Sequence, residues 1–275
     1  MDKKLSFIGA GNMGGALIQA ACRALNPSQV SITDYSPDKA RHVAQEQGCQ
    51  ASGSNREAVL FGDYIFLCVK PQVIGSVLGE ISPVLNECLA KGEAKVLVSI
   101  AAGVTIDAIR EKLSGDCREL PVIRIMPNTP VSIGKGMLAL STGENVTEGM
   151  VQDVRAALKC AGRLEQLPEA LMDQFTAIGG CAPAFVYLFI EALADGGVMT
   201  GLPRSQALTY AAQTVLGAAA MVLETGSHPG VLKDNVCSPG GSTIAGVAAL
   251  EAHGFRSAAI EAVLAAYEKN QELGK

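Results

Sequence analysis

The clearest chemical signal in the sequence is a glycine-rich turn near its start. The segment FIGAGNMGGALI places Gly9, Gly11 and Gly14 in G-x-G-x-x-G spacing, directly after an apolar run and before a helical pattern. The first glycine allows a tight turn, the second lets a pyrophosphate approach the backbone, and the third lets helix and strand pack closely. The helix N-terminus then faces the phosphates. The motif therefore predicts a dinucleotide site.

An acidic residue follows the second apolar run, at the place expected of a ribose ligand. Asp34 can bind the ribose hydroxyls and repel an added 2′-phosphate, which favours NADH. Against this, Lys39, Arg41 and Arg56 are near enough in sequence to offer a phosphate positive charge. We therefore predict NADPH or NADH as the cofactor and leave the choice open.

A second candidate site lies in the last quarter of the chain, where SPGGSTIAG (238–246) interrupts a helical region. Pro239 and two glycines end the preceding segment, and Ser242 and Thr243 begin a new helix. Unpaired N–H groups, a partial positive charge and hydroxyl donors at such a helix start can bind a carboxylate without an arginine. The alternative is that a Ser or Thr side chain simply caps the helix.

Folded elements must position these segments, and the first half of the chain alternates strand-like and helical patterns. Strand-length apolar runs occupy residues 5–8, 30–33, 64–69, 95–99, 122–126 and 137–140. Ser36 and Thr105 are candidate N-caps of intervening helices, and Gly48 closes one of them. The alternation predicts a Rossmann-type α/β domain with a doubly wound parallel sheet over residues 1–162.

The pattern becomes helical after about residue 145. Thr147 opens a helix that extends to residue 161, and 163–167 reads as a last edge strand. Helices are expected at about 170–178, 182–199, 204–224, 242–252 and 257–272. We predict an all-helical dimerisation and substrate-binding domain over 163–275. The helix at 204–224 is nearly free of charge, so either a second copy or the other domain must cover it.

Composition and charge argue against several classes of partner. A net charge of −5 gives no electrostatic reason to bind nucleic acid or an anionic membrane. The apolar stretches at 182–194 and 207–223 carry polar interruptions such as Glu191 and Gln213, so we interpret them as buried helices too polar to cross a bilayer.

The chain start and the cysteines indicate a cytoplasmic protein. Glycines interrupt the apolar residues at the start before they reach the length of a signal peptide. Eight cysteines form no C-x-x-C pair and have no adjacent His, so we predict no metal site and interpret them as small hydrophobic residues in a reducing compartment.

Five segments together resemble the pyrroline-5-carboxylate reductase family. They are GAGNMG, CVKP, SIAAGV, RIMPNTP and DNVCSPGGSTIAGVAALEAHGFRSAAIEAV, and the resemblance runs essentially the full length of the chain. It implies a Rossmann domain followed by a helical dimerisation domain, in homodimers that often build larger rings. It also implies hydride transfer from NADPH or NADH to the C=N bond of 1-pyrroline-5-carboxylate, the last step of L-proline biosynthesis.

The resemblance also assigns residues to the site. It implies that the nucleotide is lined by Gly9, Ala10, Gly11, Asn12, Met13, Gly14, Asn55, Cys68, Val69, Lys70, Pro71, Ile100, Ala101 and Ala102, and approached by Asn235. It implies that the substrate is surrounded by Val236, Ser238, Gly241, Ser242 and Thr243, with the pocket completed across the subunit interface. Met126, Pro127 and Asn128 match the family's segment beside the nicotinamide.

The chain departs from the family's pattern at two places. Tyr35 stands where many members carry an Arg suited to the 2′-phosphate, which weakens the case for NADPH. GGCAPAF (179–185) replaces the frequent SGSGPAY, so that turn offers no hydroxyl.

The predicted reaction needs no strong acid. A cyclic imine can arrive protonated, as an iminium that is already electrophilic, so the protein supplies mainly orientation and one hydrogen bond. Thr243 is the catalytic candidate, with the role of placing and polarising the C=N group. His42, His228 and His253 lie in no motif.

Two other functions remain as alternatives. A 2-hydroxyacid dehydrogenase of the 3-hydroxyisobutyrate type needs a base, usually a Lys in the first long helix of the second domain, and APAFVYLFIEALADGG contains none. A non-catalytic NAD(P)-binding sensor would use its helical half for association alone.

Overall fold

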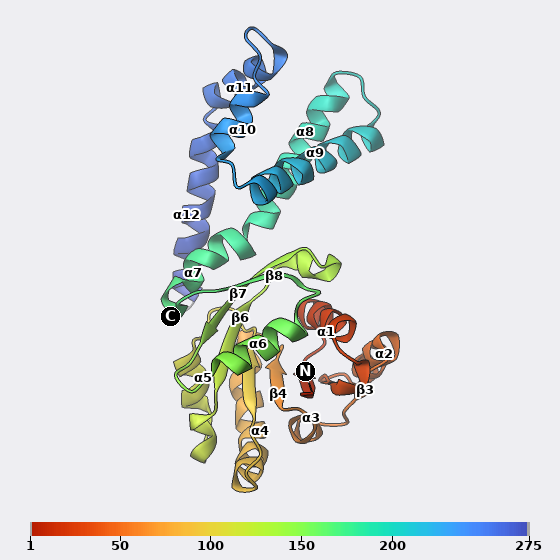
Figure 1. Ribbon diagram of the computed structural model, residues 1–275, viewed down its shortest axis with the longest axis vertical. Helices are drawn as coiled ribbons and strands as arrows, with labels where there is room; N and C mark the ends of the chain where they lie inside the picture. The colour runs from red at the N-terminus through yellow and green to blue at the C-terminus, as the bar shows by residue number, and fades with distance from the viewer. Residues whose placement is uncertain (1, 274–275) are drawn as a thin grey trace. The chain divides into compact units, whose positions relative to one another are not determined.

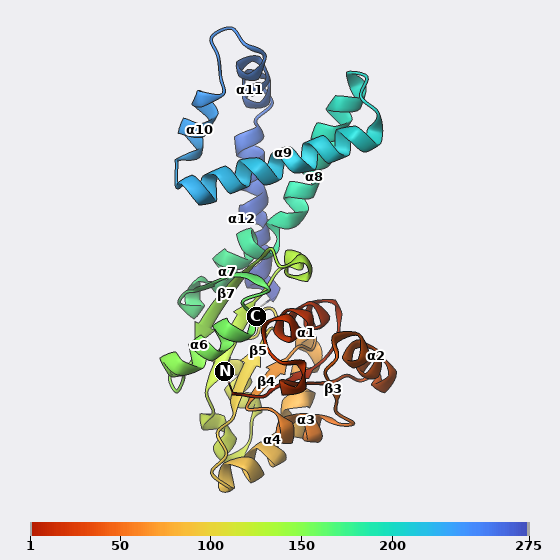
Figure 2. The same ribbon diagram turned by 45° about the vertical axis from the view of Figure 1, so that its right-hand side comes forward.

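The computed structural model describes residues 2–273, whose contacts form two compact units (Figures 1 and 2). The first comprises residues up to Gly180 together with the chain from Tyr267 onward, and the second is Cys181–Ala266. The boundary expected after residue 162 falls at the start of a strand of the first unit. The contacts therefore divide the chain later than the sequence predicted.

The first unit is built on one eight-stranded sheet in the order β3-β2-β1-β4-β5-β6-β7-β8. The strands are β1 (Leu5–Ile8), β2 (Val30–Thr33), β3 (Gln50–Ala51), β4 (Tyr64–Leu67), β5 (Val96–Ser99), β6 (Val122–Met126), β7 (Gly136–Thr142) and β8 (Gly162–Gln166). Neighbours pair in parallel except β6 and β7, which are antiparallel. The doubly wound sheet is confirmed, and the expectation that the run at 137–140 is a parallel strand is wrong.

Helices cover both faces of this sheet (Figure 1). They are α1 (Asn12–Ala24), α2 (Pro37–Gln47), α3 (Asn55–Phe61), α4 (Pro71–Ala90), α5 (Ile106–Lys112) and α6 (Glu148–Ala157). Residues of α1, α2 and α6 share one core with Phe7 and Phe66, while α3, α4 and α5 share the other with Ile65 and Leu97. Strands that are buried on both faces need apolar residues at every position, which explains why YIFL in β4 shows no alternation.

Local signals fix where these helices begin and end. The Thr105 side chain accepts a hydrogen bond from the Ala108 N–H (3.1 Å) at the start of α5, and Gly48 ends α2 with a φ of 69°. Ser36 occupies the N-cap of α2 as predicted, but its hydroxyl makes no cap hydrogen bond.

Short helical turns complete the first unit. Turns of 3₁₀ helix occupy Pro27–Gln29, Gly115–Glu119, Thr129–Ile133 and Glu169–Leu171, and they are followed by α7 (Met172–Phe175) and a π-helical turn at Thr176–Gly180. The π-helical turn coincides with the start of GGCAPAF, where the sequence departs from the family's pattern. Such turns occur frequently at functional sites.

The second unit is wholly helical among the described residues. It contains α8 (Ala182–Met199), α9 (Arg204–Thr225), α10 (Pro229–Asn235), α11 (Ser242–Ala252) and the first part of α12 (Phe255–Leu273). The short helix α10 was not predicted. Helices α8 and α9 pack side by side through Ala194, Ala207 and Ala211 (Figures 1 and 2).

The sequence-based interpretation of the apolar helices is wrong in two respects. Most side chains of α8 and α9 are exposed within the chain, so these helices are not buried by it. By length and composition alone, Pro71–Ala90, Glu169–Met199 and Arg204–Thr225 are also apolar enough to cross a membrane, so polarity does not exclude that. In the structure, α4 contributes Ile74, Leu78 and other buried residues to the core of the first unit.

Candidate active site

The turns after three neighbouring strands of the sheet lie side by side at its carboxyl edge. The Gly9 N–H donates to the Thr33 carbonyl (2.8 Å) and the Cys68 N–H to the Ile8 carbonyl (2.8 Å). The Ile100 N–H donates to the carbonyl of Leu67 (3.2 Å) in the same way. The structure thus brings together the predicted segments Gly9–Gly14, Cys68–Pro71 and Ile100–Ala102, at the edge where open α/β sheets bind ligands.

The three motif glycines have different surroundings. A Cβ atom on Gly9, whose φ is 104°, would lie 2.5 Å from the carbonyl oxygen of Cys68, and one on Gly14 would lie 2.4 Å from that of Gly9. A Cβ atom on Gly11 would meet nothing within 4 Å. The first and third glycines are therefore required by the protein's own packing, whereas Gly11 leaves open space over the turn.

The start of α1 is suited to a pyrophosphate. Its N-cap is Gly11, with no side-chain cap hydrogen bond, and Asn12 and Met13 follow. The Gly15 N–H donates to the Gly11 carbonyl (2.7 Å), which leaves the preceding N–H groups of the first turn for a ligand. Free donors, the helix dipole and the open space at Gly11 fit the diphosphate of a dinucleotide.

The turn after β4 carries a neutral thiol and an exposed lysine. Cys68 is buried, and burial raises the pKa of its thiol, so it stays protonated at neutral pH. Lys70, the N-cap of α4, is exposed, and Pro71 is the first residue of that helix. Cys68 therefore shapes the turn without adding charge, which suits the approach of a dinucleotide.

Two other predicted nucleotide residues, Asp34 and Asn55, follow strands β2 and β3 on the other side of β1. Asp34 accepts a hydrogen bond from the Ala10 N–H (2.7 Å), so its carboxylate is tied to the glycine loop. Asn55, the first residue of α3, donates from its amide to Glu80 (2.8 Å). Asn55 is therefore partnered by a carboxylate of the protein itself.

A cavity of about 170 Å³ lies beside the turns after β4 and β5. It is lined by Pro71, Gln72, Ala102, Gly103, Asp173, Thr176 and Asn270. The Asn270 side-chain nitrogen is buried and has no hydrogen-bond partner within the described part of the chain. Sequence reasoning missed Asn270, since no motif links the last helix to a turn formed far earlier in the chain.

Asn128 fixes the segment after β6. Its amide donates to the Gly179 carbonyl (2.7 Å) and accepts from the Met137 N–H (3.0 Å), and only 7% of the residue is exposed. It therefore ties together β6, β7 and the π-helical turn. Of the three residues that match the family's segment beside the nicotinamide, Asn128 has this structural role.

An ion pair supports the same region. Arg124 on β6 is 5% exposed and contacts Glu169 (3.0 Å), which also accepts a hydrogen bond from the Ile106 N–H (2.9 Å). This carboxylate therefore joins the sheet, the start of α5 and the segment that leads to α7. A buried arginine with a charged partner avoids the free-energy cost of an isolated buried charge.

The predicted substrate residues, and Asn235 of the predicted cofactor site, lie in the second unit. Asn235 ends α10, Val236 is its C-cap, and the turn Ser238–Gly241 leads into α11. The N-cap of α11 is Gly241, without any side-chain cap hydrogen bond, so capping by Ser242 or Thr243 does not occur. Both hydroxyls are exposed in the first helical turn.

The start of α11 has the properties of an anion site. Gly240 has a φ of 67°, and the Gly241 N–H donates to the Ser238 carbonyl (3.0 Å), which closes a tight turn. The Ala245 N–H makes the first main-chain bond of the helix, to the Gly241 carbonyl (3.3 Å), so the earlier N–H groups stay free. No acidic residue occupies the first turn, and a carboxylate ligand would meet no like charge there.

The side chains that most often bind metals are not grouped in the part of the chain that the structure describes. Within residues 2–273, no three His, Cys, Asp or Glu side chains are grouped as metal ligands. All eight cysteines are free thiols.

Two family models match the chain. The model described as pyrroline-5-carboxylate reductase dimerisation matches residues 169–273, and that described as NADP oxidoreductase coenzyme F420-dependent matches residues 4–103. The two matches fall on the helical half and on the amino-terminal part of the sheet, respectively.

Relatives and solved structures match the whole chain. The pyrroline-5-carboxylate reductase of Escherichia coli (strain K12) is 43% identical over 277 residues, covering 100% of both chains. The structure of a pyrroline-5-carboxylate reductase from Coxiella burnetii is similar with a TM-score of 0.90 at 31% identity, covering 100% of each chain. The crystal structure of Plasmodium falciparum pyrroline carboxylate reductase with NADP bound gives a TM-score of 0.85 at 34% identity, covering 100% of this chain and 99% of that one.

Proposed function

The chain belongs to the pyrroline-5-carboxylate reductase family, and from this we infer that it reduces the C=N bond of 1-pyrroline-5-carboxylate with NADPH or NADH, giving L-proline. The observation that carries the inference is 43% identity along the entire chain. The fold agrees with it, because the glycine loop and the turns after β4 and β5 share one edge of the sheet. When bound there, the nicotinamide supplies the hydride.

The residues of the second unit supply orientation and polarisation. The free N–H groups at the start of α11 bind the substrate carboxylate, with Gly241 allowing close approach. Val236, Ser238 and Ser242 line the same turn and complete the pocket. The Thr243 hydroxyl oxygen accepts a hydrogen bond from the N–H of the protonated imine, directly or through water, and holds the C=N group for hydride transfer.

The arrangement needs the α11 turn to meet the sheet edge of its own or a neighbouring subunit. We place Asn235 at the cofactor and complete the pocket across the subunit interface. A protonated imine is already electrophilic, so a site with hydroxyl and amide donors and no strong acid is sufficient for its reduction.

The reaction is tested by following the near-ultraviolet absorbance of the reduced nicotinamide. We expect oxidation of NADH or NADPH that depends on 1-pyrroline-5-carboxylate and yields proline. Tight cofactor binding without substrate-dependent turnover would instead indicate the non-catalytic sensor. Oxidation of a 2-hydroxyacid would indicate the dehydrogenase, which neither the lysine-free helix α8 nor the Escherichia coli relative supports.

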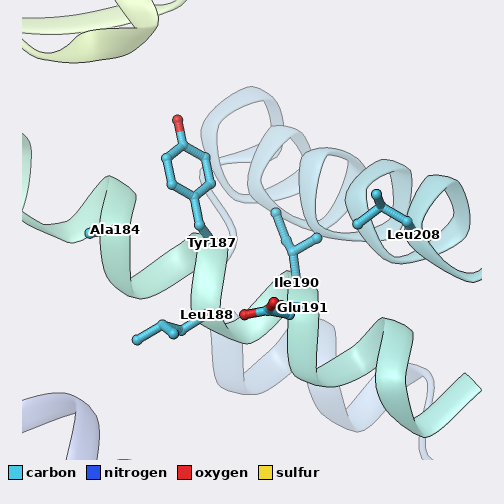
Figure 3. A pocket seen from close by; sticks show the side chains of 6 residues that line it. All are labelled: Ala184, Tyr187, Leu188, Ile190, Glu191 and Leu208. Atoms are coloured by element: carbon cyan, nitrogen blue, oxygen red, sulfur yellow. The ribbon is translucent and has the colours of Figure 1, made fainter.

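The helical half belongs to a dimerisation region, and we infer that the functional unit is a homodimer, with rings of dimers as a larger form. An apolar groove of about 630 Å³ runs along α8 and α9 (Figure 3). Tyr187, Leu188 and Leu208 line it and are between 50% and 66% exposed in the single chain. A second copy would remove this apolar surface from water.

A charge on this surface is expected to weaken the dimer. Leu208 on α9 lines the groove and is 50% exposed, and the Leu208→Glu variant would place a carboxylate in the interface at a cost of several kcal/mol. Sedimentation velocity over a concentration series should show a dimer for the wild-type chain and mainly monomer for the variant. The control Gln45→Glu adds the same charge to the exposed face of α2 and should leave the dimer intact. A compact wild-type monomer at micromolar concentration would contradict the dimer.

The cytoplasm is the compartment that we propose for this reaction. The relatives are named pyrroline-5-carboxylate reductases, and all eight cysteines are free thiols, which agrees with a reducing compartment. The proposed partner is the small-molecule substrate, with neither nucleic acid nor membrane. Fractionation of cells that make the protein would test this, because recovery with the membrane fraction would contradict it.

A further inference from the structure

We propose that the adenosine end of the nucleotide site selects NADH over NADPH, with Asp34 as the residue that determines the preference. The inference rests on the proposed use of a nicotinamide dinucleotide, and it goes beyond that proposal by naming the preferred form. It concerns the edge of the sheet where β1 and β2 end side by side, with Ile8 paired to Thr33.

The structure holds the Asp34 carboxylate in a defined position. One carboxylate oxygen accepts from the Ala10 N–H of the glycine loop (2.7 Å), and the other accepts from the Ser36 N–H at the start of α2 (3.0 Å). The residue is half-buried, and no cation pairs with it among the described residues. A fixed, unneutralised carboxylate therefore lies against the loop that receives the dinucleotide.

The two forms of the cofactor present opposite chemistry to this carboxylate. The ribose of NADH has hydroxyl groups that can donate hydrogen bonds to the remaining lone pairs of the Asp34 oxygens. The 2′-phosphate of NADPH carries negative charge and is repelled by a carboxylate at the same place. Tyr35, the next residue, is fully exposed and brings no charge that could offset this repulsion.

The basic residues that could receive a 2′-phosphate are mostly engaged with acids. Arg56 makes two hydrogen bonds to Glu87, at 3.1 and 2.6 Å. Arg41 pairs with Asp38 on the exposed side of α2. Of the three cations close to Asp34 in sequence, only Lys39 has no ion pair in the described part of the chain.

Polar groups at the starts of α3 and α2 are also paired with acids or lie beside them. Asn55, at the first position of α3, donates its amide to Glu80 (2.8 Å) rather than leaving it free for a phosphate. The first turn of α2 carries Asp38 in addition to the Asp34 carboxylate at its N-cap amide. A 2′-phosphate would therefore have to break existing polar contacts and approach a carboxylate at the same time.

The test compares equilibrium binding of NADH and NADPH in the absence of substrate. We expect the full-length wild-type protein to bind NADH more tightly than NADPH. In the Asp34→Ser variant, the dissociation constant of NADPH divided by that of NADH should fall about 10- to 100-fold. Because binding is measured without substrate, a failure of the proposed reaction would appear as missing turnover and would not alter this ratio.

Two further variants separate charge from loop positioning. Asp34→Asn removes the charge and keeps one carbonyl oxygen, which can accept from either the Ala10 or the Ser36 N–H, so it should reduce the ratio even if Asp34→Ser disturbs the glycine loop. Glu46→Ser removes an acid about 13 Å further along α2, beyond a Debye length at ordinary salt, and should leave the ratio unchanged. Tighter binding of NADPH by the wild type, or an unchanged ratio in Asp34→Asn, would overturn the proposal.

Discussion

The Thr243→Ala variant is expected to reduce kcat about 10- to 1000-fold, similar to the loss of one positioned hydrogen-bonding group in other enzymes. Thr243 is exposed in the first turn of α11, and its hydroxyl makes no cap hydrogen bond. The substitution therefore removes a hydroxyl that the fold does not use, and the helix should form as before. Steady-state turnover with 1-pyrroline-5-carboxylate at saturating cofactor measures the effect.

Controls distinguish this role from a general change in the helix. Thr243→Ser keeps the hydroxyl and should restore most of the turnover, whereas alanine and serine at this position should give similar thermal unfolding. The affinity for NADH should be unchanged in all three proteins, because the glycine loop is part of the other compact unit. Wild-type turnover in Thr243→Ala would contradict the assignment.

The sheet could be predicted largely because its strands are buried on both faces. Runs such as LSFI, VSIT and YIFL have no competing helical period, and each became a strand with the expected bounds or close to them. The two-residue strand β3 was missed, because Gln50 and Ala51 are exposed and carry no apolar signal.

The direction of β7 follows from the length of the connection that precedes it. Parallel neighbours need a crossover of about a dozen residues or more, usually with a helix. The connection from Met126 to Gly136 is shorter than that, and it contains only a 3₁₀ turn at Thr129–Ile133. An antiparallel pair was therefore the only arrangement open to these two strands.

The helical half shows where sequence patterns stop being informative. Apolar composition predicted α8 and α9 at nearly their observed bounds, but it could not say what covers them. Burial of a helix depends on its neighbours, and a partner subunit leaves the same apolar signal as the core of one chain. The apolar composition of α8 and α9, which had suggested burial within one chain, therefore also fits an exposed groove that a partner subunit covers.

In the candidate site, the features set by local sequence were predictable and those set by distant contacts were not. The glycine loop was predictable because its spacing follows from local geometry, a tight turn followed by a helix start. The tie from Ala10 to Asp34 and the lining of a cavity by Asn270 depend on which distant segments come together, and spacing along the chain does not contain that information. The free N–H groups of α11 were predicted, whereas the identity of its N-cap required the backbone of Gly241.

The glycine loop allows the roles of two glycines to be separated by experiment. The Gly14→Ala variant would place a methyl group where its Cβ lies 2.4 Å from the Gly9 carbonyl oxygen, inside contact distance of backbone that cannot move freely. We expect a loss of about 1–3 kcal/mol of stability, or more, from overpacking. Thermal or denaturant unfolding of the protein without cofactor measures this effect.

The Gly11→Ala variant is expected to act on the ligand alone. Its methyl group meets no protein atom within 4 Å, so unfolding should change by no more than about 0.5 kcal/mol. The same methyl group would stand in the open space over the start of α1 and displace the pyrophosphate, and we expect cofactor affinity to fall by about 100-fold. Gly15→Ala is the matched control, because its Cβ would lie 4.0 Å from the nearest carbonyl oxygen, and alanine favours a helix interior. If Gly11→Ala bound NADH and NADPH as the wild type does, the phosphates could not lie at this turn, and the dinucleotide site would have to be placed elsewhere on the sheet.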